Sequence, residues 1–331
     1  MSWAADISGR RLPLRPFSLI PRTGALARAN EQLRPGYRKS GYLRFPQLIA
    51  FPNGVMRNLC NTDEKETPMN LSDIQRVTLS DPPRVVIYGP PGVGKTSLAA
   101  EFPAPIFLQT EDGISAGMEI DTFGKLKSWN GVFDALRALA NPGHDYQTVV
   151  LDSVDQLEPL IWAHVCEENG WESIEAPGYG KGYIEVDALW FKLFAGLNYL
   201  RDEFKMNVVL IAHSTIVSWP NPTGAEFPRW DIRLQKRAHC IVEDSVDAIL
   251  MIDYDNATKE EKGRGGAKTV KSSGSTLRWI HCQGSPARNA KNRYGMPDKV
   301  LYNKGEAFTT LAQYFPGATP NSPHPRQPES E

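Results

Sequence analysis

The sequence contains little cysteine, no long apolar run and almost no net charge. Its four cysteines are widely separated and include no C-x-x-C pair, which is typical of reduced thiols in a cytosol rather than of a disulfide framework or a zinc site. No apolar run approaches the roughly 18 residues needed to cross a bilayer, and the N-terminus lacks the charged-then-apolar order of a secretion signal. We therefore expect a soluble cytoplasmic protein without a membrane partner.

The net charge of −1 conceals an uneven distribution of charged residues. Residues 1–68 contain eleven Lys and Arg against five Asp and Glu, a charge of +6, so the remaining residues carry −7. This segment is rich in Arg, Pro and Gly, which predicts disorder. It is either a basic arm for nucleic acid or an overlong gene prediction with Met69 as the initiator. We expect residues 69–315 to fold and residues 316–331, with five prolines, to form a disordered tail.

The most informative stretch is RVVIYGPPGVGKTSLAAEF, in which an apolar strand, a glycine-rich turn and a short helix precede Pro103. The turn fits the pattern G-x-x-x-x-G-K-[ST]. Backbone N–H groups of such a turn bind nucleotide phosphates, Lys95 reaches the β and γ phosphates, and Thr96 holds Mg²⁺. The residues predicted to bind ATP are Gly89, Pro90, Pro91, Gly92, Val93, Gly94, Lys95, Thr96 and Ser97.

Polar side chains follow three further apolar strands. YQTVVLDSVDQL ends its strand at Asp152, PIFLQTEDG leads to Glu111, and MNVVLIAHST leads to His213. Because the carboxyl ends of parallel strands share one edge of a sheet, these side chains are expected to converge on the nucleotide. Asp152 is the predicted Mg²⁺ residue; Asp155 is the alternative, but it falls in the pattern of the following helix.

Glu111 and His213 then have candidate roles in hydrolysis. Glu111 is the candidate general base that orients the attacking water, and His213 is the candidate sensor of the γ-phosphate. The alternative for Glu111 is a carboxylate that stabilises a helix N-terminus. The alternative for His213 is a buried histidine whose hydrogen bonds are satisfied within the core.

These residues resemble the RecA-type ATPase core over about residues 80–312, and in particular the minimal RecA-like ATPases of bacteriophages, some of which are single-strand annealing recombinases. The resemblance is carried by PPRVVIYGPPGVGKT, the stretch from GYGKGY to VVLIAHS, RLQKRAHCIVEDSVDAILMIDY and AKNRYGMPDKVLYN. It implies an α/β fold, a RecA-like P-loop NTPase core with a mostly parallel β-sheet flanked by helices. It also implies ATPase activity with Mg²⁺, but the chain shows no folded N-terminal domain or sizeable C-terminal DNA-binding domain that would support strand exchange.

Two segments are candidate contacts for single-stranded DNA, because lysine meets phosphate and aromatic rings stack on bases. The first is PGYGKGY at residues 177–183, where the family has its first DNA loop, with Tyr179, Lys181 and Tyr183; the alternative is a flexible linker. The second is the predicted loop SWPNPTGAEFPRWDIRLQKR at residues 218–237, which matches the second DNA loop. Its candidate residues are Arg229, Trp230, Lys236 and Arg237, unless its tryptophans only pack it against the body. Residues 256–275 are predicted to be a disordered hairpin tip.

The stretch ARNAKNRYGMP at residues 287–297 reads as a polar turn that places Lys291 and Arg293 on the same side. In the RecA-type family such turns reach the nucleotide of a neighbouring subunit and neutralise charge there. The resemblance therefore implies a homo-oligomer, either a ring or a filament. The alternative is a solvated surface turn.

The function expected from the sequence is an ATPase that binds single-stranded DNA and acts in phage-type recombination or annealing, in a bacterial host cytoplasm. A single-strand DNA-binding protein is a possible partner. One alternative is an ATP-gated helicase loader or other replication-associated P-loop module. Another is a small-molecule kinase, which would need a lid of arginines over a second substrate pocket.

Overall fold

The computed structural model describes residues 74, 76, 78–221, 224–262 and 268–316. The basic segment 1–68, Met69 and nearly all of the Pro-rich tail lie outside the described residues, so the expectations for them stay predictions. Within the described ranges, no helix has the length and apolar character that a membrane crossing requires.

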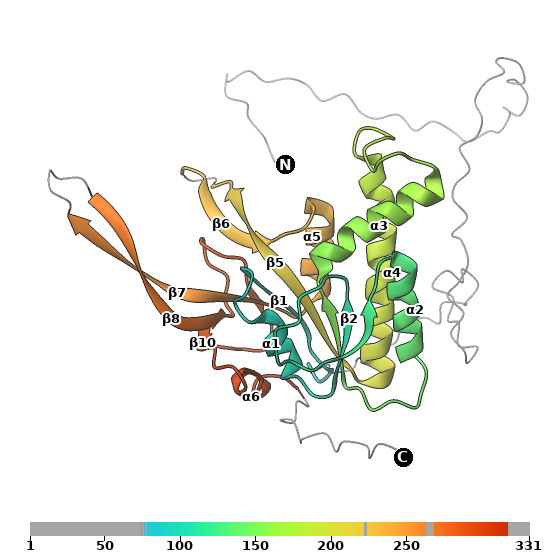
Figure 1. The fold of residues 1–331 in the computed structure, drawn as a ribbon, viewed down its shortest axis with the longest axis horizontal. Helices are drawn as coiled ribbons and strands as arrows, with labels where there is room; N and C mark the ends of the chain where they lie inside the picture. Colours follow the sequence, from blue (N-terminus) through green and yellow to red (C-terminus); the bar gives the residue numbers. More distant parts are fainter. Residues whose placement is uncertain (1–73, 75, 77, 222–223, 263–267, 317–331) are drawn as a thin grey trace, which may run out of the picture. The chain divides into compact units, whose positions relative to one another are not determined.

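A ten-stranded, mostly parallel sheet organises the described residues (Figure 1). Its parallel strands lie in the order β7-β1-β5-β4-β2-β3. They are β1 (Arg84–Gly89), β2 (Pro105–Gln109), β3 (Asp121–Lys125), β4 (Thr148–Asp152), β5 (Asn207–Trp219) and β7 (Ala248–Lys262). Strand β4 is buried along its whole length because parallel strands are covered on both faces. The predicted α/β fold class is confirmed.

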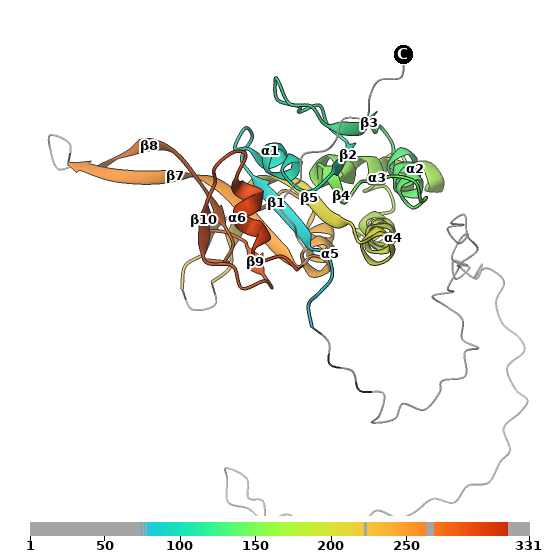
Figure 2. The same ribbon diagram turned by 90° about the horizontal axis from the view of Figure 1, so that it is seen from below.

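Antiparallel strands extend this sheet. They are β6 (Phe227–Ile232), β8 (Lys268–His281), β9 (Lys291–Asn292) and β10 (Lys299–Leu301). Strands β7 and β8 form a long hairpin whose pairing continues to Lys262 and Lys268, so the predicted disorder over 256–275 is wrong for the described part. The hairpin projects from the end of the sheet opposite to β2, β3 and β4 (Figure 2).

The predicted loop 218–237 is also wrong, because β5 and β6 pair as an antiparallel hairpin. Its register runs from Ser214 opposite Ile232 to Trp219 opposite Phe227. The β-branched and aromatic residues of this stretch supply the cross-strand pairs that stabilise a hairpin. Pro228 is tolerated there because proline occurs in edge strands. The resemblance to the family predicted a loop here, and the pairing was missed.

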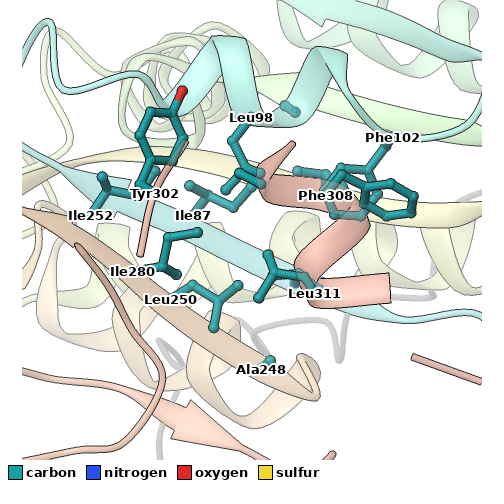
Figure 3. Close-up of a cluster of buried hydrophobic side chains, with 14 of the residues drawn as sticks. Ile87, Leu98, Phe102, Ala248, Leu250, Ile252, Ile280, Tyr302, Phe308 and Leu311 are labelled. Carbon is teal, nitrogen blue, oxygen red and sulfur yellow. The ribbon is translucent and has the colours of Figure 1, made fainter. Parts of the chain in front are cut away.

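Helices cover both faces of the sheet. They are α1 (Lys95–Ala100), α2 (Trp129–Leu139), α3 (Val154–Asn169), α4 (Lys181–Phe204), α5 (Lys236–Ser245) and α6 (Ala307–Ala312). On one face, α1 and α6 pack their apolar side chains on β1, β7 and β8, with Phe102 and Phe308 in ring contact (Figure 3). On β1 this face includes Ile87, whereas Arg84, which points to the opposite face, contacts Asn198 of α4. The helices α2, α3 and α4 pack against one another.

The segment 177–183 is a compact turn followed by the first turn of α4. Gly178, Tyr179 and Gly180 have left-handed backbone conformations, with φ values of 69°, 50° and 68°. Helix α4 begins at Lys181, so Lys181 and Tyr183 are helical rather than part of a loop. Gly182 is required by packing, because a Cβ atom there would lie 2.0 Å from the carbonyl oxygen of Ile174.

We predict that Gly182→Ala lowers the free energy of unfolding by about 1–3 kcal/mol, because the added methyl group must displace the backbone at Ile174. The matched control is Gly131→Ala in the first turn of α2, where the new Cβ would meet the Ser128 hydroxyl at 3.4 Å and the Leu126 Cδ2 atom at 3.9 Å. The control should gain up to about 1 kcal/mol in helix propensity. Urea unfolding of the two variants checks the prediction, and equal stability of both would contradict it.

Candidate functional site

The glycine-rich turn between β1 and α1 has a conformation that its glycines make possible. Gly92 and Gly94 have φ values of 74° and 109°, and Gly94 immediately precedes α1. A Cβ atom on Gly94 would lie 2.6 Å from the Tyr302 hydroxyl, and one on Gly89 would lie 2.3 Å from the carbonyl oxygen of Ile252. Any larger residue at these two positions would therefore push the turn away from β7 and from the segment after β10.

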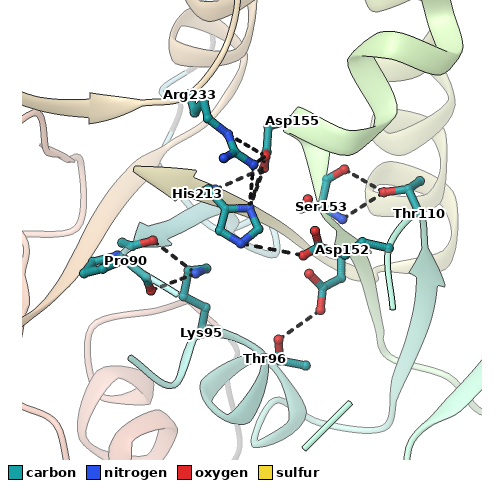
Figure 4. Close-up of polar contacts among 11 residues, drawn as sticks. Pro90, Lys95, Thr96, Thr110, Asp152, Ser153, Asp155, His213 and Arg233 are labelled. Carbon is teal, nitrogen blue, oxygen red and sulfur yellow. Dashed lines mark hydrogen bonds and ion pairs between the residues drawn. The ribbon is translucent and has the colours of Figure 1, made fainter. Parts of the chain in front are cut away.

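Lys95 is buried beneath this turn. Its ammonium group donates hydrogen bonds to the carbonyl oxygens of Gly89 and Pro90, each at 3.1 Å (Figure 4). Burial lowers the pKa of Lys95, while the nearby carboxylates of Asp152 and Glu111 act in the opposite direction. The ammonium is thus held by neutral carbonyl groups that an anionic ligand can replace.

Asp152 lies at the end of β4, where its carboxylate accepts a hydrogen bond from the Thr96 hydroxyl at 3.0 Å. Burial raises the pKa of Asp152 to about 6, although the Thr96 bond acts to lower it. Among the described residues, no Lys or Arg forms an ion pair with Asp152. A buried carboxylate with a hydroxyl beside it and no ion-paired Lys or Arg is a pair of oxygen ligands that suits a hard divalent cation.

Glu111 and His213 reach the same edge of the sheet. His213 on β5 is level with Gly89 on β1, and its Nε2 atom lies 4.0 Å from the Glu111 carboxylate, which follows β2. The structure therefore brings Lys95, Thr96, Asp152, Glu111 and His213 together. Asp112, the next residue, is exposed and pairs instead with Lys125.

Asp155 lies in the first turn of α3, in the helix where the sequence pattern placed it. Its carboxylate accepts the backbone N–H of His213 at 3.0 Å, lies 3.1 Å from the His213 Nδ1 atom, and accepts hydrogen bonds from Arg233. Although burial acts to raise the pKa of Asp155, the bonds from His213 and Arg233 hold it well below its ordinary value. Asp155 is thus occupied by these two partners.

Arg233 follows β6 and was missed by the sequence reasoning, which treated it as one of several cations in a loop. Its guanidinium contacts Asp155 and also lies 3.2 Å from the His213 Nδ1 atom, while its side chain remains half exposed. Arg233, at the base of the β5–β6 hairpin, therefore contacts His213, the residue that faces Glu111. In His213, Nδ1 has internal partners and Nε2 faces Glu111, and its role as a sensor of the γ-phosphate stays a prediction.

Lys291 and Arg293 lie at the opposite edge of the sheet from the glycine-rich turn. Residues 291–292 form the short strand β9 rather than a turn, and β9 pairs with the first residues of β7, which are level with the start of β1. Lys291 donates to the carbonyl oxygen of Glu243 at 2.6 Å, and Arg293 pairs with Asp247 at 3.1 Å. Within one chain these cations do not reach the chain's own site.

The predicted DNA-contacting residues fall into separate places. Tyr179 is fully exposed and Lys181 is exposed, whereas the Tyr183 hydroxyl donates to Glu175. Arg229 lies over the Trp219 ring, 4.2 Å from its centroid. Three predicted DNA-contacting residues remain. The backbone of Trp230 forms hydrogen bonds with the backbones of Ala287 and Asn289. Lys236 is exposed, and Arg237 forms an ion pair with Asp187 of α4.

A second carboxylate on α3, Glu158, has an environment opposite to that of Asp155. It accepts the backbone N–H of Gln235, which precedes α5, at 3.2 Å. Burial raises the pKa of Glu158 to about 7, although the Gln235 bond acts to lower it. Two carboxylates one helical turn apart thus favour different protonation states.

Comparison with known protein families matches residues 81–294 to the family described as an AAA domain. No curated protein matches the chain. Among solved structures, one similar chain is the RadB recombinase, which is 15% identical in sequence with a TM-score of 0.37; the match covers 67% of this chain and 86% of that chain.

We predict that Asp155→Asn lowers the free energy of unfolding near pH 7 by about 1–3 kcal/mol, because Arg233 and His213 lose their charged partner. The lowered pKa of Asp155 means that wild type loses this advantage as the pH falls below the ordinary aspartate value. Glu158→Gln should behave oppositely and gain relative stability as the pH rises from 4.5 through about 7, where wild type must ionise a buried acid.

Chemical unfolding of wild type and both variants between about pH 2 and pH 8 measures these differences, because the Asp155 contribution changes only below the ordinary aspartate pKa. A gap between wild type and Asp155→Asn that stays constant with pH would contradict the assigned pairing. Glu158→Gln serves as the matched control, because it changes a neighbouring carboxylate on the same helix.

Proposed function

Because the chain belongs to the AAA-domain family, a family of P-loop ATPases, and has a RecA-like fold, we propose that it hydrolyses ATP under the control of single-stranded DNA, in phage-type recombination or annealing. The observation that carries the proposal is the convergence of Lys95, Thr96, Asp152, Glu111 and His213 at one edge of the sheet. These groups come from four different parts of the chain and include both cation and carboxylate functions that phosphoryl transfer uses.

The N–H groups of residues 92–97 would bind the phosphates, and Lys95 would exchange its two carbonyl partners for the β and γ phosphates. Thr96 and Asp152 would hold Mg²⁺; the buried Asp152 carboxylate, with Thr96 as its hydrogen-bond partner, fits this ion. When bound, Mg²⁺ supplies positive charge that stabilises the transferring phosphoryl group. Burial raises the pKa of Asp152 to about 6, and a bound cation would favour the ionised carboxylate.

Glu111 would accept a proton from the attacking water and orient it, while His213 would meet the γ-phosphate through Nε2. The Nδ1 side of His213 contacts Asp155 and Arg233. A displacement of His213 toward phosphate would therefore be transmitted to Arg233 and to the base of the β5–β6 hairpin. This link supports a nucleotide-dependent position for that hairpin.

Single-stranded DNA is the proposed regulator because two places combine cations with exposed aromatic rings. One is the exposed Trp219 ring with the half-buried Arg229 over it on the β5–β6 hairpin, and the other is the exposed turn with Tyr179 and Lys181. Rings of this kind stack on bases, and cations displace the counterions of the phosphate backbone. The proposal includes a homo-oligomer and a single-strand DNA-binding protein as partners.

A helicase loader would share the nucleotide site but would show slow turnover or none. A small-molecule kinase is disfavoured by the pocket beside Glu111. It is lined by Gln109, Glu111, Asp112, Gly113, Ile114 and Lys125. It contains two carboxylates and no arginine, which is a poor lining for a second phosphate-accepting substrate with an arginine lid.

The first test is ATP hydrolysis with and without single-stranded DNA. Lys95→Ala should reduce hydrolysis by at least about 100-fold, because it removes the cation that the turn itself would place beside the γ-phosphate. Lys127→Ala, an exposed lysine outside the site, is the matched control and should keep full activity. Stimulation by DNA supports the proposal, tight ATP binding with negligible turnover favours a loader, and retained turnover in Lys95→Ala would refute the site.

A second prediction concerns Lys291 and Arg293, which we propose complete the site of a neighbouring subunit. Their place at the opposite edge of the sheet suits head-to-tail assembly, in which one protomer's far edge meets the next protomer's phosphate turn. Protomers with Lys291→Ala and Arg293→Ala should lose activity and regain part of it when mixed with Lys95→Ala protomers. Each mixed interface of the right order would pair an intact phosphate turn with intact cations.

The matched control mixes the double variant with protomers that carry all three substitutions, which cannot offer intact cations and should restore nothing. Because Lys291 and Arg293 also contact Glu243 and Asp247 within the chain, thermal unfolding must show that the double variant is folded. Co-assembled mixtures that stay inactive would exclude a role for these cations in a neighbour's site.

A further inference from the structure

The phosphate-binding turn has a side that the proposed catalytic residues do not occupy. Asp152 and His213 belong to β4 and β5, and Glu111 follows β2; these three strands lie on one side of β1. The terminal phosphate must approach these residues, so the rest of the nucleotide must extend toward the other side of β1. That side contains β7, β8 and β10.

Two side chains from this side touch the phosphate-binding turn directly. Arg278 on β8 donates a hydrogen bond to the carbonyl oxygen of Val93 at 2.9 Å, and the Tyr302 hydroxyl, just after β10, donates to that of Gly94 at 3.1 Å. Both would also collide with a Cβ atom on Gly94, at 2.9 and 2.6 Å. Both side chains therefore contact the turn directly, although β7 lies between β8 and β1 in the sheet.

Arg278 and Tyr302 also form a stacked pair. The Arg278 guanidinium carbon lies 4.3 Å from the centre of the Tyr302 ring. Tyr302 is buried in the core with Ile252 and Ile280, and its hydroxyl points away from these aliphatic side chains (Figure 3). The ring thus supports the guanidinium from the core side and fixes its plane.

The outer part of the Arg278 guanidinium has no anionic partner. Among the described residues, no carboxylate lies within ion-pair distance of Arg278, and the Val93 carbonyl is its one hydrogen-bond acceptor. Arg278 is half-buried rather than covered. A guanidinium with an aromatic ring on one face offers its other face to a planar base, because arginine stacks well on π systems.

We propose that Arg278, supported by Tyr302, forms the nucleoside subsite of this chain and stacks against the base of a purine nucleoside triphosphate. This inference rests on the proposed ATP site, and it adds the residues that bind the part of the ligand beyond the phosphates. Arg278 also connects the β7–β8 hairpin to the nucleotide, since it lies on β8.

A purely structural role for Arg278 makes a different prediction. If Arg278 only braced the turn through Val93, its loss would weaken every ligand that binds through phosphates. If it stacks on the base, its loss weakens ATP and spares inorganic tripolyphosphate, which has the phosphates and no nucleoside. Comparing the two ligands therefore separates the roles without any measurement of hydrolysis.

The experiment measures the affinity of the full-length protein for Mg²⁺-ATP and for Mg²⁺-tripolyphosphate by calorimetry. Arg278→Ala should weaken ATP binding about 5-fold to 30-fold and change tripolyphosphate binding less than about 2-fold. Arg278→Lys, which keeps the charge but not the plane, should also weaken ATP. Tyr302→Phe keeps the ring and removes the bond to Gly94, so it should retain most of the ATP selectivity.

Equal weakening of both ligands in Arg278→Ala, or no change in either, would overturn the nucleoside subsite. Thermal unfolding of each variant without ligand identifies any general loss of structure, and Arg278→Lys then decides the question for a folded variant. Lys95→Ala should lose both ligands. A wild-type protein that bound tripolyphosphate and ATP equally would refute this inference alone, whereas one that bound neither would refute the ATP site as well.

Discussion

The site depends on the way in which a parallel sheet brings strand ends to one edge. Strand β5 lies between β1 and β4, so the phosphate-binding turn and Asp152 are separated by one strand and bridged by Thr96. That spacing sets the proposed phosphate position between Lys95 and the carboxylates, at the end of strands that are buried on both faces. The order of strands, more than any single contact, brings residues from four parts of the chain to one edge.

Asp155 gives this edge its connection to the rest of the molecule. Its charge is retained in a buried position because Arg233 and the backbone N–H of His213 donate to it and the His213 ring lies beside it. The Asp155 carboxylate therefore contacts both His213, which faces Glu111, and Arg233, which lies at the base of the β5–β6 hairpin. Nucleotide chemistry and the proposed DNA-contacting hairpin share one anionic anchor, which is a physical basis for coupling the two.

The two edges of the sheet have different chemical characters. The carboxyl edge holds the phosphate-binding turn, and the amino edge holds Arg84, Arg293 and Asp247 in a shared ion-pair cluster. Arg293 remains half exposed within that cluster. A chain with a phosphate site at one edge and partly free cations at the other is suited to repetition along an axis. The assembly itself stays a proposal.

Local sequence determined the turn between β1 and α1 and the apolar strands, because glycine spacing and buried β-branched runs depend on neighbouring residues alone. It also predicted that Asp152, Glu111 and His213 would share an edge, since parallel strands make this a matter of topology. Only the tertiary structure decided that residues 218–237 form a hairpin, that Lys181 begins a helix, and that Arg233, Arg278 and Tyr302 reach the site. These contacts join residues far apart in the chain, and their geometry follows from strand order and packing, which no local pattern specifies.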